Sequence, residues 1–229
     1  MTLHRFFVEP AAMAGDAFVL PSTIERQVRS VLRLGDGDRI VLLPGDGSEV
    51  LCRLDGDDCV VEQRAANAAE PRHRLTVVQA LLKGDALEQV IQHATEIGVA
   101  GFRLVITERC VVRDLSPRKL ERLRTIAREA AEQSERGVVP AIDAPVRLAD
   151  ALSPGSVLLH ERSDRPGLAR LDPPAAVIIG PEGGWSPAET ADVERAGIGV
   201  ASLGARILRS ETVAVAAAAV VLSRSGDFA

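Results

Sequence analysis

The stretch Ile178–Glu189, IIGPEGGWSPAE, ends an apolar run in a loop that holds three glycines and the only tryptophan of the chain. The apolar run predicts a strand of a parallel sheet, and ligands bind such sheets beyond the carboxyl ends of their strands. Glycine there permits the close approach of another group to the backbone. The tetrapeptide SPAE has the pattern of a capping box with proline at the first helical position, so a helix is expected directly after the loop.

The glycine loop does not have the composition of a phosphate site. The chain contains neither a G-x-x-x-x-G-K-[ST] nor a G-x-G-x-x-G motif, and the loop carries Glu182 but no lysine or arginine. A neutral or cationic ligand held by backbone groups therefore fits better than an anion. From this loop alone, the alternative that the glycines serve only a tight turn stays open.

A second loop repeats the design. In SLGARILRSETVAVAAAAV, residues 202–220, a strand ends near residue 204 and a helix begins near residue 210. Because both loops follow strands of one parallel sheet, we expect them at the same sheet edge, where they can wrap one small molecule. Leu203, Ile207 and Leu208 can cover an adenine ring. Arg206 and Arg209 can contact substrate or simply face solvent.

The rest of the chain divides into two segments with different sequence patterns. Residues 1–64 contain short apolar runs separated by turns, among them RIVLLPGDGSEVLCRL with its hairpin signal PGDG. From residue 75, strand patterns alternate with helical ones, which predicts a mostly parallel sheet with helices on both faces. Asp85 and Glu88 have the spacing of a capping box at the start of one such helix. We expect a β-rich barrel domain at residues 1–70 and an α/β domain at residues 74–229.

Composition and charge narrow the class. Of the 229 residues, 46% are hydrophobic and 26% are charged, as in globular proteins with a substantial core. No apolar run approaches the roughly 20 residues that span a bilayer, and the three cysteines fit neither a zinc site nor a disulfide framework. The net charge of −5 argues against a nucleic-acid partner, but residues 103–136 hold nine basic and six acidic residues. A local basic surface and a solvated helix face are both compatible with that segment.

Four stretches of the second segment resemble the signature motifs of one family. They are KGDALEQVIQHATEIGV (83–99), REAAEQSERGVVP (128–140), GPEGGWSPAE (180–189) and LGARILRSETVAVAAAAV (203–220). With HRFFV and VRSVLRLGDGDRI near the N-terminus, they are similar, in the expected order, to the RsmE family. This is the family of bacterial ribosomal small-subunit RNA uridine-N3 methyltransferases, in the SPOUT superfamily. Residues 24–27 depart from the family pattern, which often has a histidine there.

The resemblance implies a fold and a cofactor. The fold is a SPOUT α/β-knot, a deep trefoil knot in a mostly parallel sheet, preceded by a PUA-like β-barrel that binds RNA. The cofactor is S-adenosylmethionine, bent in the knot and held mostly by main-chain groups, with no metal. The residues implied to contact it are Leu159, His160, Glu161, Ile179, Gly180, Pro181, Glu182, Gly183, Gly184, Leu203, Gly204, Ile207, Leu208 and Arg209.

The resemblance also implies methylation of N3 of a uridine in 16S rRNA of the 30S subunit, m3U1498, by a cytoplasmic homodimer with no membrane partner. Arg209 is the first candidate for catalysis, because a cation favours the negative charge that builds on uracil. Glu182 and Glu211 are candidates to accept the proton, and Glu211 can equally be a first-turn helix carboxylate. Contacts to RNA phosphates are expected from Arg5, Arg29, Arg33, Arg109, Arg113, Arg118, Lys119, Arg122 and Arg128.

Two alternatives stay open. One is a SPOUT methyltransferase with another RNA target, such as a ribose 2′-hydroxyl. The other is a non-catalytic RNA-binding or ribosome-assembly factor that kept the knot and lost the chemistry. RNA from a deletion strain tests the first alternative: loss of 3-methyluridine favours the uridine target, and loss of a ribose-methylated nucleoside favours the other target. Binding of S-adenosylmethionine tests the second alternative, since a non-catalytic factor is expected not to bind it.

Overall fold

The computed structural model describes residues 3–161 and 164–228. The chain forms two compact units, and each is described by itself. The first unit combines the chain up to Glu70 with Ala131–Val139, and the second combines Pro71–Ala130 with Pro140 and the residues that follow it. The first unit thus takes in a short segment that the sequence pattern assigned to the α/β domain.

The first unit is built on a five-stranded sheet in the order β1-β3-β4-β5-β2. Its strands are β1 (His4–Phe7), β2 (Ala17–Val19), β3 (Arg39–Leu43), β4 (Ser48–Asp55) and β5 (Asp58–Ala66), and helix α1 (Ser22–Arg26) precedes β3. β1 and β3 are parallel, whereas the other pairs are antiparallel. The predicted hairpin at residues 44–47 is confirmed, because it joins β3 to β4.

The return of residues 131–139 to this unit has a local cause. Arg136 is only 2% exposed and forms a two-pronged ion pair with Glu70, at 3.2 and 2.9 Å. Glu132 accepts a hydrogen bond from the backbone N–H of Phe7 at 3.0 Å, and Ala131 packs with Phe7 and Val41. Residues distant in sequence hold this segment, so no local sequence pattern predicts that it packs with the first unit.

The second unit contains a seven-stranded sheet in the order β12-β10-β11-β6-β7-β8, with β9 also paired to β7, and every pair is parallel. The strands are β6 (Thr76–Ala80), β7 (Gly101–Ile106), β8 (Ala141–Ile142), β9 (Val146–Arg147), β10 (Ser156–Leu159), β11 (Ala176–Ile179) and β12 (Gly199–Ala201). The predicted α/β class with a mostly parallel sheet is confirmed. The carboxyl ends of β10, β11 and β12 meet at one edge.

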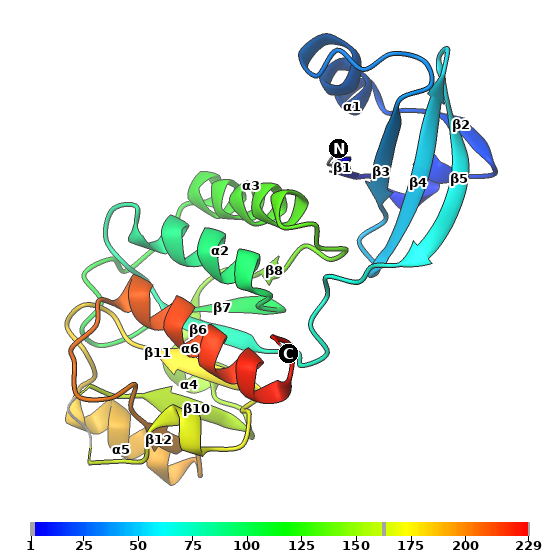
Figure 1. Ribbon diagram of the computed structural model, residues 1–229. Helices are drawn as coiled ribbons and strands as arrows, with labels where there is room; N and C mark the ends of the chain where they lie inside the picture. The colour runs from blue at the N-terminus through cyan, green and yellow to red at the C-terminus, as the bar shows by residue number, and fades with distance from the viewer. Residues whose placement is uncertain (1–2, 162–163, 229) are drawn as a thin grey trace. The chain divides into compact units, whose positions relative to one another are not determined.

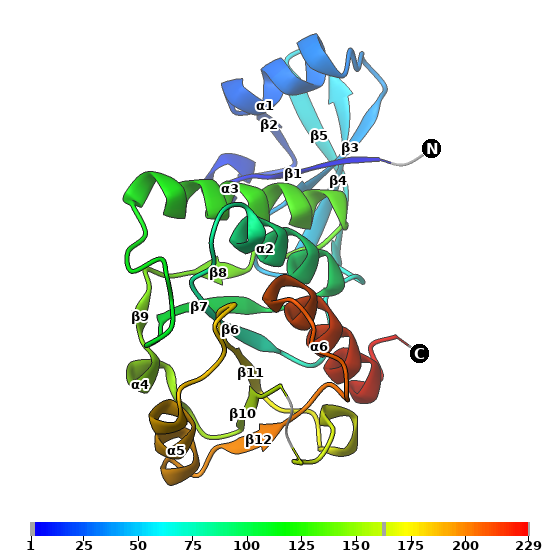
Figure 2. The same cartoon turned by 90° about the vertical axis from the view of Figure 1, so that its left-hand side faces the viewer.

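Helices cover both faces of this sheet. They are α2 (Ala86–Ile97), α3 (Pro117–Gln133), α4 (Leu148–Ala151), α5 (Pro187–Arg195) and α6 (Ser210–Ser225). Figure 1 shows α2 and α6 side by side, and Figure 2 shows them on one side of the strands with α4 and α5 on the other. Buried Val, Leu, Ile and Ala side chains fill the layers between helices and sheet.

The helix starts match the sequence signals with one exception. The capping box of α5 is complete, because Ser186 and Glu189 each accept from the other's backbone N–H, and the Ser116 hydroxyl accepts from the N–H of Lys119 at the start of α3. The capping box expected from Asp85 and Glu88 is wrong. Asp85 precedes α2 but its side chain makes no cap bond, because its backbone lies outside the extended region that capping requires.

All three cysteines are buried free thiols. Cys52 and Cys59 belong to the core of the first unit, and Cys110 lies buried in the loop after β7. Across the described residues, the helices are too short or too polar to cross a lipid bilayer.

Candidate active site

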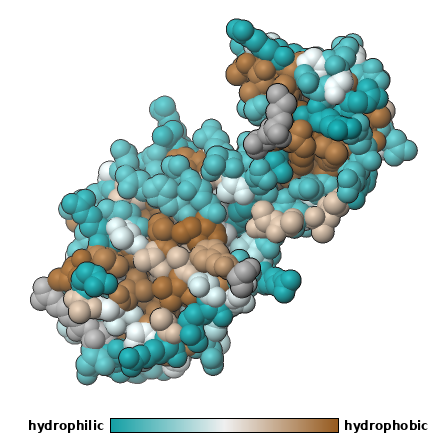
Figure 3. Space-filling view, in the orientation of Figure 1, coloured by the Kyte–Doolittle hydropathy of each residue, from teal (hydrophilic) through white to brown (hydrophobic). Residues whose placement is uncertain are grey.

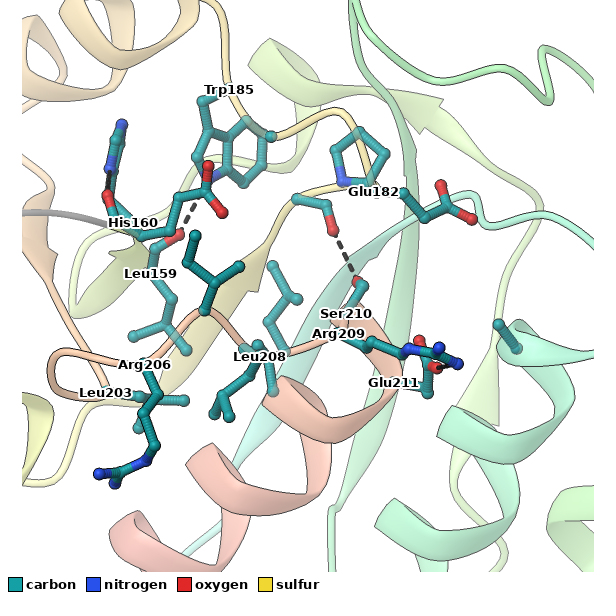
Figure 4. Close-up of a pocket in the computed structure, with 18 of the residues that line it drawn as sticks. Leu159, His160, Glu182, Trp185, Leu203, Arg206, Leu208, Arg209, Ser210 and Glu211 are labelled. Atoms are coloured by element: carbon teal, nitrogen blue, oxygen red, sulfur yellow. Dashed lines mark hydrogen bonds and ion pairs between the residues drawn. The ribbon is translucent and has the colours of Figure 1, made fainter.

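A cavity of about 500 Å³ opens where β10, β11 and β12 end. The two glycine-containing loops follow β11 and β12, and the end of β10 lies between them because β10 pairs with both strands. The expectation that both loops share one sheet edge is therefore confirmed. Figure 4 shows the side chains that converge on this cavity.

The structure brings together nearly all of the residues that the sequence analysis assigned to the cofactor. From the end of β10 come Leu159, His160 and Glu161, and from the loop after β11 come Ile179, Gly180, Pro181, Glu182 and Gly184. From the loop after β12 come Leu203, Gly204, Ile207, Leu208 and Arg209. Gly183 does not line the cavity. A Cβ atom at Gly183 would stand 3.1 Å from the Cβ atom of Arg109, so its glycine makes room for a neighbouring loop.

Part of the room that the glycine loop leaves is filled by the protein's own Trp185 side chain. A Cβ atom at Gly180 would stand 3.0 Å from the indole ring of Trp185. That ring is 7% exposed, and its Nε1 donates to the carbonyl oxygen of Leu159 at 2.9 Å. Trp185 thus ties the end of β11 to the end of β10. Gly184 has φ of +68°, a left-handed conformation that favours glycine.

Further bonds brace the glycine loop from outside the cavity. Glu182 accepts from the backbone N–H of Lys83 at 3.0 Å. Arg109 donates to the carbonyl oxygen of Gly183 at 3.1 Å, and Glu189 accepts from the backbone N–H of Glu108 at 2.7 Å. The loop after β7 therefore packs against the glycine loop.

The three candidate catalytic residues lie on one side of the cavity. Figure 4 shows Glu182, Arg209 and Glu211 on the side away from His160 and Leu203. The Arg209 side chain is 87% exposed, with its guanidinium 4.0 Å from a carboxylate oxygen of Glu211, whose side chain is 22% exposed. Both residues flank the start of α6. This arrangement places an exposed cation and two carboxylates on the same side of the cavity.

Four residues that the sequence did not point to also line the cavity: Ala86, Trp185, Ser210 and Val213. Arg206, expected either to contact substrate or to face solvent, lines it as well. The lone tryptophan inside the glycine motif was a usable signal for Trp185. Ser210 was quoted only as a helix start. Its hydroxyl donates to the carbonyl oxygen of Gly180 at 2.7 Å, across 30 residues of chain.

The candidate RNA contacts fall in both units. In the first, Arg5 pairs with Glu135 and Arg29 pairs with Asp36, and Arg33 is exposed. In the second, the guanidinium groups of Arg109 and Arg113 donate to carbonyl oxygens of nearby loops. Exposed side chains on α3 include Arg118 and Arg128.

Two of the α3 cations share one carboxylate. Lys119 and Arg122 both bind Glu88 of α2, the latter at 2.9 Å. The hydrogen bonds from Arg122 and Lys119 lower the pKa of Glu88, and the same carboxylate raises the pKa of Arg122. These two cations therefore contribute to helix packing as well as to surface charge.

Comparison with known proteins decides the family. A sequence model described as an RNA methyltransferase domain matches residues 69–222. The ribosomal RNA small subunit methyltransferase E of Mycobacterium bovis is 32% identical, over 98% of this chain and 94% of its own. The chain belongs to the RsmE family. It is therefore a methyltransferase of the ribosomal RNA type, as the resemblance implied.

Other members of the RsmE family agree. The enzyme of the same name from Synechocystis is 31% identical over 94% of this chain and 76% of its own. A crystal structure of the RsmE protein of Neisseria gonorrhoeae, bound to S-adenosylmethionine, superposes with a TM-score of 0.86 at 28% identity, covering 97% of this chain and 98% of that one. Each of the two units therefore has a counterpart in that RsmE structure.

Proposed function

We propose that this protein transfers a methyl group from S-adenosylmethionine to N3 of a uridine in 16S rRNA of the 30S subunit, the m3U1498 modification. The observation that carries the proposal is the single cavity formed by the β10 end and the two glycine loops, in a chain of the RsmE family. A relative with the same fold binds S-adenosylmethionine.

The residues of the cavity fit this cofactor. Its volume of about 500 Å³ lies within the range of small-molecule sites. Leu203, Ile207 and Leu208 offer an apolar wall suited to an adenine ring. Glu161 and Glu182 supply negative charge in a cavity meant for a cationic sulfonium, and backbone groups of the glycine loops can hold the polar parts.

When bound, S-adenosylmethionine supplies an electrophilic methyl group on a positively charged sulfur. The protein's part is mainly to align the acceptor base, since proximity and orientation contribute about 7–11 kcal/mol in well-aligned systems. Arg209 stabilises the negative charge that develops on the uracil carbonyls. Glu182 or Glu211 accepts the N3 proton, because both carboxylates lie on the Arg209 side of the cavity.

We also propose the finer architecture that the family implies. The segment Leu203–Arg209 would belong to a trefoil knot in a methyltransferase domain at residues 74–229, and residues 1–70 would form a PUA-like barrel that contacts RNA. Phosphates would be held by the arginines and lysine of both units, with a few contacts and shape replacing a strongly basic surface. An assembled 30S subunit in the cytoplasm is the substrate we expect, with the target base unstacked.

A homodimer completes the proposal. Apolar side chains on α6 are only half-buried, among them Val213, Val215 and Val220. Figure 3 shows hydrophobic residues gathered over the face where Figure 1 places α6. Such a patch suits a two-fold interface between copies. Light scattering in solution should give twice the chain mass.

The decisive experiment is transfer of labelled methyl from S-adenosylmethionine to 30S subunits isolated from a strain that lacks the modification. Digestion to nucleosides should place the label in 3-methyluridine. Label in a ribose-methylated nucleoside would move the proposal to another RNA target, and equal labelling of naked 16S rRNA would remove the requirement for an assembled subunit.

A further inference from the structure

A buried amide connects the sheet to both loops of the cavity. Gln79 lies in β6, is 0% exposed, and its Nε2 donates to the hydroxyl of Ser210 at 3.0 Å and to the carbonyl oxygen of Ala80 at 3.1 Å. Ser210 in turn donates to the carbonyl oxygen of Gly180 at 2.7 Å, the dashed line between them in Figure 4. Three separate segments thus meet at one serine hydroxyl.

The direction of this chain is set by chemistry. A serine hydroxyl has one hydrogen to donate, and the Gly180 oxygen can only accept it. Ser210 must therefore accept from Gln79. The carbonyl oxygen of Ala80 can only accept as well, so the amide nitrogen, and not the oxygen, of Gln79 faces both partners. The order is Gln79 to Ser210 to Gly180.

The arrangement carries an energetic penalty for folding. Within residues 3–161 and 164–228, the buried Oε1 of Gln79 has no hydrogen-bond partner. A buried acceptor without a partner destabilises the folded state, and a methionine of similar shape would avoid that cost. A residue that breaks a packing rule in this way is expected at functional sites.

What Gln79 contributes is the relative position of the two loops. In the described part of the chain, the Ser210–Gly180 bond is the one hydrogen bond between the 203–211 segment and the 179–186 loop. Ser210 also stands between Arg209 and Glu211. The hydroxyl therefore sets where both candidate catalytic side chains leave the backbone.

We propose that Gln79 and Ser210 are positioning residues, which hold the Gly180 carbonyl and the start of α6 in the register that the cavity needs for S-adenosylmethionine. The inference rests on the proposed function, since it names how the cofactor cavity is kept in shape. It assigns a site role to a strand residue that does not itself line the cavity.

Binding of S-adenosylmethionine can be measured without turnover by tryptophan fluorescence. Trp185 lines the cavity, it is the only tryptophan, and the chain has no tyrosine. Titration of the full-length protein with S-adenosylmethionine should change the Trp185 fluorescence. Gln79→Met should weaken binding about five- to tenfold, the equivalent of one lost hydrogen bond. Its Tm should stay unchanged or rise, because the unpaired oxygen is removed.

Ser210 provides the second arm. Ser210→Ala should weaken the binding of S-adenosylmethionine about tenfold, whereas Ser210→Thr, which keeps a hydroxyl, should bind within about threefold of the wild type. The double variant Gln79→Met/Ser210→Ala should bind no more weakly than Ser210→Ala alone, since the effects of coupled residues are not additive. Ser156→Ala is the matched control, a buried serine whose hydroxyl pairs with Ser153 at the other end of β10, and it should bind normally.

The outcomes separate the two proposals. If the wild-type protein fails to bind S-adenosylmethionine, the proposed function is wrong. If the wild type binds and Gln79→Met or Ser210→Ala binds equally well, the positioning role is wrong while the function stands. A Gln79→Met variant that loses Tm but keeps its affinity also overturns the positioning role, since a purely structural residue behaves in that way.

Discussion

The two loops that line the cavity are held very differently. The loop after β11 is anchored on several sides, by Trp185 on Leu159, by Glu182 on Lys83 and by the capping box of α5. The segment Leu203–Arg209 is largely exposed, with Ile207 56% and the Arg209 side chain 87% accessible. Among the described residues, the hydrogen bond that links this segment to the first loop is made by the next residue, Ser210, to the carbonyl oxygen of Gly180.

This difference divides the work of the site. The anchored loop is a wall that exists before any ligand arrives, so changes in it should affect both stability and binding. The exposed segment presents apolar and cationic side chains to solvent, and the proposed function would have them meet the cofactor and the RNA. Changes in that segment should alter chemistry or affinity and leave the free energy of unfolding nearly unchanged.

The largest expected effect is at Arg209, in the exposed segment. Arg209→Ala should lower turnover at saturating S-adenosylmethionine by about 100-fold, because a charge-stabilising group is lost from the reaction. Its Tm should equal that of the wild type. Arg195→Ala, an exposed arginine of α5 that does not line the cavity, is the control and should retain most activity. Unchanged turnover of Arg209→Ala would remove this residue from the mechanism.

The next effect is in the anchored loop. Gly180→Ala places a methyl group 3.0 Å from the Trp185 ring, so the indole must move and the protein should lose about 1–3 kcal/mol of unfolding free energy. Binding of S-adenosylmethionine should weaken as well. Gly199→Ala in β12 is the control, since its new methyl group meets its nearest neighbour at 3.9 Å. Equal stability of the two variants in urea titrations would show that the anchored loop is not tightly packed.

A smaller change tests the anchor itself. Trp185→Phe keeps an aromatic ring but loses the indole N–H that binds the carbonyl oxygen of Leu159. We expect a loss of about 1 kcal/mol, measured by circular dichroism in urea because the fluorescence reporter is gone. Arg206→Ala, in the exposed segment, is the stability reference and should unfold like the wild type. A stability equal to that of the wild type would mean that the two strand ends are held together by packing alone.

The smallest expected effect is on thermal stability and lies outside both loops, at Glu88 of α2. Hydrogen bonds from Arg122 and Lys119 lower the folded-state pKa of Glu88 below its ordinary 4.5. This carboxylate therefore adds stability that is fully present above the unfolded pKa and is lost as the pH falls through the lowered folded pKa. Glu88→Gln should lower Tm at pH 7 by about 1–2 °C, and the gap to the wild type should close in acid. A gap that persists at low pH would contradict this assignment.

Much of the site was predictable from short stretches of sequence. Apolar runs ending in glycine loops located the carboxyl ends of β11 and β12, and the SPAE tetrapeptide located the start of α5. The Asp85–Glu88 pattern located the start of α2 but not a capping box, because the backbone of Asp85 is not extended and the Glu88 carboxylate binds Lys119 and Arg122 of α3. Local spacing predicts a cap only when nothing distant competes for the same carboxylate.

By itself, the sequence determined the alternation of strands and helices, the sheet edge of the two loops and the family, since each depends on residues within a few positions of one another. Only the tertiary structure decided that Trp185 is bonded to Leu159, that residues 131–139 pack with the first unit, and that Ser210 meets Gln79 across 131 positions. The physical reason is that buried polar groups must find hydrogen-bond partners wherever the fold brings them. No spacing along the chain encodes those pairings.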